Sequence, residues 1–176
     1  GNPVGMYRRD FVVPDSWENR QLYIHFGSVS SAFYIWVNGE KVGYHEDSKT
    51  PAEFNITDNV KAGMNELAVE VYRWCDGSYL EDQDFWRLSG IERDVYLLAV
   101  PQVRIRDFLV NAGLNGQYKD GELELDVVLD TPAGKDLSSH MLTVKLLDEG
   151  RLLYEENRNP APTSQIPLKL SFKTEM

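Results

Sequence analysis

The sequence has only one cysteine, Cys75, and three histidines in 176 residues. A single cysteine excludes an intrachain disulfide and a four-cysteine zinc site. We expect Cys75 to be a small packed side chain beside Trp74 rather than a reactive thiol. His25, His45 and His140 are too far apart in the sequence to show metal-ligand spacing, and we expect them to be surface side chains. The sequence therefore predicts neither a disulfide framework nor a histidine metal centre.

Positive charge and long apolar runs are also scarce. Lys and Arg number 18 against 28 Asp and Glu, which gives a formal net charge of −10. Binding to nucleic acid requires a basic face, so we expect no nucleic-acid partner. No segment approaches the roughly 18 apolar residues of a membrane-spanning helix, so we expect no membrane partner. A glycine-rich phosphate loop and a G-x-S-x-G motif are absent, and neither nucleotide nor serine-hydrolase chemistry is indicated.

What the sequence does contain is repeated alternation of apolar and polar residues, which is typical of half-buried strands. The alternation runs through residues 22–26, 67–72, 122–129, 142–146 and 168–172. Asn38-Gly39 separates two such strands, at 32–37 and 40–44, and this pair is the strongest short signal for a type I′ hairpin. Because no window shows helical periodicity, we predict an all-β protein.

The character of the chain changes near Pro101. All four tryptophans precede this residue, and the block that follows has none. We predict a jelly-roll β-sandwich over residues 1–100 and a small immunoglobulin-like β-sandwich over residues 101–176. Within the first sandwich we expect Trp17 and Trp36 to belong to the core.

The segment at residues 73–98 combines acids with large aromatic rings around a turn. These residues are Asp76, Glu81, Asp82, Asp84, Trp74, Phe85 and Trp86. Carboxylates accept hydrogen bonds from sugar hydroxyls, and flat rings cover the C–H faces of a sugar. Binding residues are often found on loops that a rigid scaffold positions. The pattern therefore predicts a sugar site.

Four acids this close together cannot all be buried without compensation. At least one should face a cation, a ligand or an arginine, for which Arg87 and Arg93 are the nearest candidates. The alternative is a salt-bridged loop that braces the sheet edge. A retaining glycosidase needs two carboxyl groups roughly 5–5.5 Å apart on opposite sides of the scissile bond, and neighbours in one loop rarely satisfy this. We therefore predict no complete catalytic pair and select Asp84 and Trp86 as substrate-binding residues.

Asn65-Glu66 is a second pair that resembles a catalytic motif. It opens a strand whose apolar alternation already explains it, so we expect a structural role.

Three stretches together carry a resemblance to a known family. They are YRRDFVVPDSW at 7–17, SAFYIWVNGEKVGYHEDSKTPAEFNIT at 31–57 and VKAGMNELAVEVYRWCDGSYLEDQDFWRLSGIERDVYLL at 60–98. They closely resemble the N-terminal part of family 2 glycoside hydrolases, in particular the β-galactosidase branch. The resemblance runs from about residue 2 to residue 110 and then fades.

The resemblance implies a fragment of a retaining β-galactosidase that hydrolyses terminal β-galactosides such as lactose. Residues 1–100 would be the jelly-roll sugar-binding domain, with its opening strands upstream of Gly1, and residues 101–176 part of the first immunoglobulin-like domain. In this family the two catalytic glutamates belong to a TIM barrel, so we expect this chain alone to be inactive.

The resemblance also implies roles for single residues. Asp84 occupies the family's position for a monovalent cation, Na⁺ or K⁺, and contacts the galactosyl hydroxyls; a carboxylate bound to a cation stays ionised. Mg²⁺ is expected only in the intact enzyme. The expected partners are the substrate, the TIM barrel of the same enzyme and further copies in a homo-oligomer. Two alternatives remain: a stand-alone carbohydrate-binding module that uses Trp86 and Phe85, and a structural or oligomer-contact module.

Overall fold

The structure, a computed structural model, describes residues 1–81, 84, 86–132, 136–160 and 172–175. It divides into two units, Gly1–Pro101 and Gln102–Met176, at a point one residue beyond the predicted boundary. Across the described ranges, helix is limited to α1 (Gly77–Leu80) and the 3-10 turns η1 (Asp15–Trp17) and η2 (Thr57–Asn59), so the all-β prediction is confirmed. In that part of the chain, no helix has the length and apolar character needed to cross a membrane.

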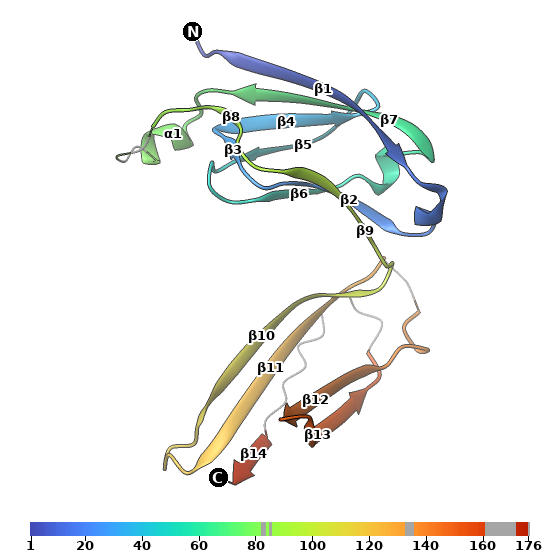
Figure 1. Ribbon diagram of the computed structural model, residues 1–176, viewed down its shortest axis with the longest axis vertical. Helices are drawn as coiled ribbons and strands as arrows, with labels where there is room; N and C mark the ends of the chain where they lie inside the picture. The colour runs from blue at the N-terminus through green and yellow to red at the C-terminus, as the bar shows by residue number, and fades with distance from the viewer. Residues whose placement is uncertain (82–83, 85, 133–135, 161–171, 176) are drawn as a thin grey trace. The chain divides into compact units, whose positions relative to one another are not determined.

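The first unit is built from antiparallel sheets that form two layers (Figure 1). One sheet has the order β1 (Val4–Val13), β7 (Gly63–Tyr72), β4 (Ala32–Val37), β5 (Glu40–Glu46). The other has the order β6 (Ala52–Asn55), β2 (Gln21–Phe26), β9 (Val95–Val100). A short pair, β3 (Val29–Ser30) with β8 (Gly90–Ile91), lies at the end of the unit from which α1 projects.

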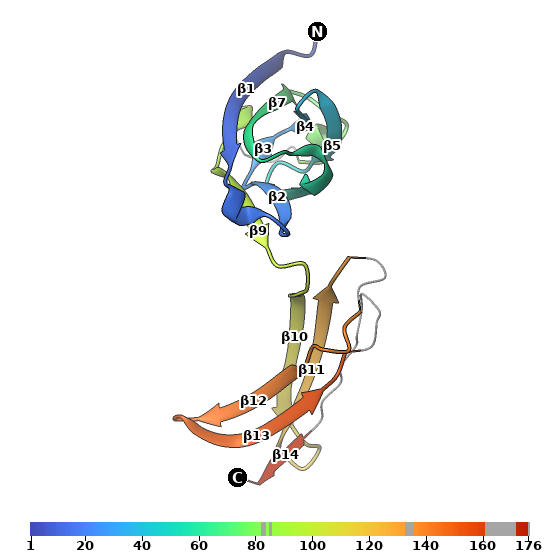
Figure 2. The ribbon, with the colours of Figure 1, turned by 90° about the vertical axis from the view of Figure 1, so that its right-hand side faces the viewer.

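Alternate residues of the long strands form one apolar core, around which the strands curve in Figure 2. In β4, Phe33 and Ile35 are fully buried. In β7, Val69 and Val71 are buried, and from the opposite sheet β2 contributes Phe26. Burial of a side chain of this kind contributes about 1.5–3 kcal/mol to folding, so the two-residue period of these strands holds the two layers together.

The Asn38-Gly39 turn joins β4 to β5 as the sequence predicts. Both residues have positive φ, 52° and 84°, which a type I′ turn requires. The Asn38 side-chain amide donates hydrogen bonds to Asn65 Oδ1 and to the Asn59 carbonyl, each at 2.8 Å. Its Oδ1 accepts from the Glu66 N–H at 3.0 Å. Asn65 is 2% exposed, and its bonds to this turn support the structural role that we expected.

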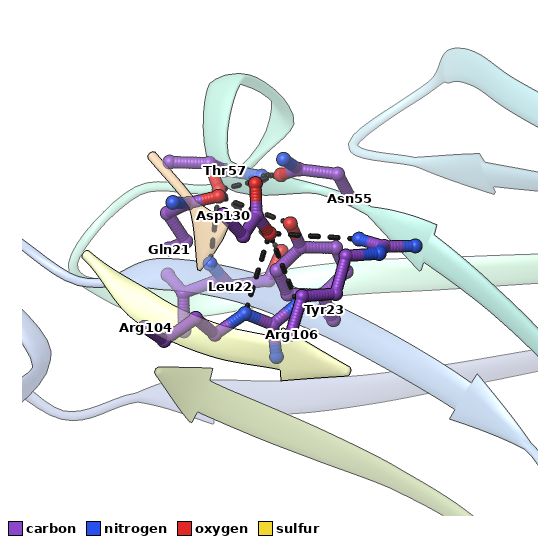
Figure 3. A network of polar contacts seen from close by, with 8 residues as sticks. All are labelled: Gln21, Leu22, Tyr23, Asn55, Thr57, Arg104, Arg106 and Asp130. Atoms are coloured by element: carbon purple, nitrogen blue, oxygen red, sulfur yellow. Dashed lines mark hydrogen bonds and ion pairs between the residues drawn. The ribbon is translucent and has the colours of Figure 1, made fainter. Parts of the chain in front are cut away.

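A threonine fixes the end of the second sheet (Figure 3). Thr57 Oγ1 accepts a hydrogen bond from the Leu22 N–H at 2.9 Å and donates one to Asn55 Oδ1 at 2.6 Å. The Ile56 N–H also donates to the Leu22 carbonyl at 2.8 Å. These bonds attach η2 to β2 and satisfy backbone groups beyond the end of β6.

The second unit contains two sheets. They are β10 (Arg104–Leu114), β11 (Asp120–Asp130), β14 (Phe172–Glu175) in that order, and the pair β12 (Leu142–Asp148) with β13 (Arg151–Arg158). Their core is small: Val127 and Leu129 are buried, with Leu125, Leu142 and Val144 packed against them. Of the predicted strand at 168–172, residue 172 lies in β14, and residues 168–171 are outside the described residues.

A charged cluster joins β10 to β11 in this unit (Figure 3). Asp130 accepts from Arg104 Nη2 at 3.2 Å and from Arg106 Nη1 at 3.5 Å. Two guanidinium groups on one carboxylate reinforce the strand pairing close to the bulge between Ile105 and Asp107.

The positive φ of Gly39 gives a test of the hairpin. An added Cβ at Gly39 meets no atom within 4 Å, so Gly39→Ala introduces backbone strain without a clash. We expect this variant to lower the free energy of unfolding by about 1–2 kcal/mol, measured by chemical denaturation. Gly77→Ala, in α1 of the same unit, is the control and should change stability by less than about 0.5 kcal/mol. Equal losses in the two variants would contradict the turn assignment.

Candidate functional site

The acidic and aromatic loop at residues 73–89 begins at the end of β7 and returns through β8. At its base, β8 pairs with β3, with Gly90 opposite Ser30. At its start, the Trp74 N–H donates to Asn2 Oδ1 at 3.0 Å, and Asn2 Nδ2 donates to the Trp74 carbonyl at 2.7 Å. The Arg73 N–H donates to the Pro3 carbonyl at 3.0 Å. Segments that are far apart in the sequence thus hold both ends of the loop.

Two arginines connect the outgoing and returning parts of this loop. Arg73 Nη2 donates to the Arg87 carbonyl, and Arg87 Nη1 donates to the Ser78 carbonyl, each at 3.2 Å. The Arg73 guanidinium also lies over the Trp74 ring, 5.2 Å from its centroid. Such charge-assisted bonds to backbone carbonyls connect the described parts of the loop near its base.

Glu81 attaches the loop to the segment between β5 and β6. Its Oε2 accepts from Ser48 Oγ at 2.6 Å and its Oε1 accepts from the Ser48 N–H at 3.2 Å. Ser28 Oγ in turn donates to the Ser48 carbonyl at 2.6 Å, and both serines are buried. Because two donors of Ser48 satisfy the Glu81 carboxylate, this acid braces the loop through hydrogen bonds to a serine, not through the salt bridge of the alternative.

A pocket of about 290 Å³ lies between this loop and the β5–β6 segment. Its lining includes Ser48, Lys49 and Glu81 on the polar side and Trp74 and Trp86 on the aromatic side. Hydroxyl, charged and ring groups around one cavity suit a ligand that carries both hydroxyl and C–H surface. Ser48 and Lys49 were not selected from the sequence, because no motif connects them to a loop 30 residues further along.

The predicted site residues do not all lie at this pocket. Trp86 lines it and is 90% exposed. Asp84 is exposed and is not among the lining residues. Asp76 Oδ1 accepts the Gly77 N–H at 3.1 Å, at the start of α1. Asp82 and Phe85 lie outside the described residues.

The remaining sequence candidates have other positions. His25 is mostly buried, with 15% of its side chain exposed, because it pairs with Glu53 and stacks on Tyr96; the surface assignment is wrong for this residue. Trp17 packs against the core as expected. Trp36 does not: it alternates with the buried Ile35 and Val37 and lies on the outer face of its sheet.

A serine, a glutamate and a lysine form a charged network beside the pocket. Ser30 Oγ donates to Glu92 Oε1 at 2.7 Å, and Lys49 Nζ lies 3.3 Å from Glu92 Oε2. The Ser30 hydroxyl first, and Lys49 after it, lower the pKa of Glu92 below its ordinary value. Ser30 and Lys49 both line the pocket, so Glu92 fixes part of its wall.

This network predicts a pH dependence. A carboxyl whose pKa is lower in the folded state stabilises the fold above its unfolded pKa, and this contribution is lost as pH falls through the folded pKa. Glu92→Gln should therefore reduce the slope of the unfolding free energy against pH between about pH 5 and pH 3. Denaturation at several pH values measures the slope. The exposed Glu40→Gln is the control, and an unchanged slope in Glu92→Gln would contradict the network.

An all-β sandwich with a polar pocket rimmed by tryptophans is an architecture that carbohydrate-binding domains use. The model of "Glycosyl hydrolases family 2, sugar binding domain" matches residues 1–101. The chain belongs to glycosyl hydrolase family 2.

Curated relatives agree with this family. The chain is 59% identical over 124 residues to the β-galactosidase of Priestia megaterium, which covers 70% of this chain and 12% of the relative. It is 51% identical over 126 residues to the β-galactosidase of Clostridium acetobutylicum, which covers 72% of this chain and 14% of the relative. The matched region is thus a small part of each relative's length.

Solved structures share the fold. A Ruminococcus gnavus β-glucuronidase superposes with a TM-score of 0.74 over 97% of this chain and 29% of its own, at 23% identity. A β-glucuronidase from an uncultured Clostridium gives a TM-score of 0.71 at 24% identity over the same share of this chain. At 23% and 24% identity, this structural similarity shows that the chain has the same fold.

Proposed function

We propose that this chain forms one wall of the substrate site of a retaining β-galactosidase. The observation that carries the proposal is a loop that hydrogen bonds hold at its base. Beyond this base, the loop exposes Trp86 and Asp84 to solvent. The identity of 59% to a β-galactosidase supports galactosides over other sugars of the family. The substrates would be terminal β-galactosides such as lactose.

Asp84 would hold a monovalent cation, Na⁺ or K⁺, and orient a galactosyl hydroxyl. Its chemistry fits this role, because an exposed carboxylate offers hard oxygen ligands to a hard cation. One carboxylate cannot complete the coordination of such an ion, so other segments of the enzyme and the hydroxyls of the sugar would supply further oxygens. The Trp86 ring would cover a C–H face of the sugar.

The described acids of the loop do not form a catalytic pair. Glu81 is hydrogen-bonded to Ser48, and Asp76 binds the backbone at the start of α1. We therefore assign the acid/base and nucleophile glutamates, and the Mg²⁺ site, to a TIM barrel elsewhere in the enzyme. On this account the chain binds and orients the sugar, transfers no proton and is inactive alone.

The surface of the loop supports contact with a further domain. Among the described residues of the loop, four apolar side chains are strongly exposed, which is unusual for a solvent-facing loop. They are Tyr79 (86%), Leu80 (87%), Trp86 (90%) and Leu88 (73%). A barrel packed against the loop would cover these side chains. Assembly of the enzyme into a homo-oligomer stays a prediction.

The second candidate is a stand-alone carbohydrate-binding module, which the exposed Trp86 ring also favours. Isothermal calorimetry of the 176-residue chain with lactose separates the two. Heat of binding at millimolar sugar would favour the module, and no heat is expected if the barrel supplies most of the contacts.

Substitution of Asp84 in the intact enzyme tests the proposal. We expect Asp84→Asn to lower kcat/KM for a β-galactoside by roughly 10²-fold, because a charged contact to the substrate and the cation is lost. The rate should also lose its dependence on Na⁺ or K⁺. The matched control is Asp76→Asn, an acid of the same loop with a backbone role. Full activity and retained cation dependence in Asp84→Asn would exclude the assignment.

A further inference from the structure

The outer face of the four-stranded sheet carries a second, aromatic pocket, which adjoins the loop and shares Trp74 with the loop pocket. The strand register places Tyr34 of β4 opposite Tyr44 of β5, and Ala32 of β4 opposite both Glu46 of β5 and Tyr72 of β7. These positions alternate with core residues, so their side chains point away from the core. Cross-strand neighbours in such rows lie within side-chain contact.

A small residue among large ones creates the hollow. The pocket measures about 340 Å³ and is lined by Ala32 together with Tyr34, Tyr44, Tyr72 and Trp74. The Tyr34 and Tyr44 ring centroids lie 4.6 Å apart, and Tyr34 meets Tyr72 edge-on at 6.0 Å. Since Ala32 has only a methyl group where its neighbours have rings, it leaves space between them.

Carboxylates hold the phenol groups of this pocket. Tyr44 Oη donates to Glu46 Oε2 at 2.9 Å. Burial first, and then the hydrogen bond to Glu46, raise the pKa of Tyr44 above its ordinary value. Burial and a hydrogen bond to Glu70 do the same for the pKa of Tyr72. Both phenols therefore stay neutral donors.

The charge of the pocket is negative. Glu46, Cys75 and Asp76 each place a potential ligand atom within 4.8 Å of the others. Across the described parts of the chain, neither Glu46 nor Asp76 forms an ion pair with a basic side chain. A positively charged ligand beside these two carboxylates would be attracted by both, whereas a neutral ligand would not.

The rings of this face already attract cations. Lys41 Nζ lies 3.9 Å from the Tyr34 ring centroid, and the Arg73 guanidinium lies over Trp74 at 5.2 Å. Aromatic faces with nearby carboxylates are the arrangement that recognises quaternary ammonium groups.

We propose that this aromatic pocket, lined by Ala32, Tyr34, Tyr44, Tyr72 and Trp74, binds an organic ammonium group such as that of choline. Ring faces other than those that Lys41 and Arg73 cover would contact the N-methyl groups. Glu46 with Asp76 would balance the charge. Trp74 lines both this pocket and the loop pocket described above, whereas Asp84 lines neither of them. The inference does not depend on the proposed function.

Choline and its uncharged isostere 3,3-dimethylbutan-1-ol test the proposal directly. The 176-residue chain is titrated with each in a buffer containing a chelator, and amide shifts are followed by NMR. Choline should bind in the millimolar range, with shifts confined to residues 32–34, 44–46 and 72–76. The isostere should bind about tenfold more weakly, because it has the same shape without the charge.

Variants identify the site. Ala32→Leu should abolish the choline response by filling the pocket. Glu46→Gln should weaken binding roughly three- to tenfold without changing the pocket's volume, and it keeps the test valid if Ala32→Leu does not fold. Glu66→Gln, on the same sheet face but paired with Arg8, is the matched control and should bind choline as the parent chain does. The proposal would be overturned if the isostere bound as tightly as choline or if choline gave no response. A response to methyl β-galactoside without one to choline would also overturn it.

Discussion

The pairing of β4 with β7 is the constraint on which the rest of the first unit depends. Its register places Phe33 opposite Val71 and Ile35 opposite Val69, and these four side chains face the core. Because side chains alternate along a strand, the same register sends Tyr34 and its neighbours to the outer face. A shift by one residue would exchange the two faces, so the core and the aromatic pocket are specified together.

The same strand also positions the loop. β7 ends at Tyr72, and the chain passes directly into Arg73, whose backbone and side chain are both hydrogen-bonded. The polar contacts of Ser48 with Glu81 then fix the far side of the loop. The sheet therefore provides the stability, and the loop, held at several points, provides a surface with exposed rings. Support of this kind would lower the entropic cost of the sugar binding proposed for the loop.

Much of the fold follows from local patterns in the sequence. Alternation predicts β2 and β7, and Asn38-Gly39 predicts the hairpin, because each depends on neighbouring residues alone. The expectation that Trp36 lies in the core is wrong, because its alternation with the buried Ile35 and Val37 places it on the outer face. The partnership of Glu81 with Ser48 was not predictable, since it joins segments that only the closed sandwich brings together. The sequence selects Asp84 among the four acids, and this choice remains a prediction. The partners of Glu81 and Asp76 follow only from the structure.

The central claim is that Asp84 is a cation ligand in the substrate site of a larger enzyme. Crystals of the intact enzyme soaked in Rb⁺, a heavier analogue of K⁺, test it most directly by anomalous diffraction. The account predicts an anomalous peak at coordination distance from the Asp84 carboxylate, on the side of the sugar pocket. The claim would be contradicted if Rb⁺ activated the enzyme fully while every anomalous peak lay away from Asp84.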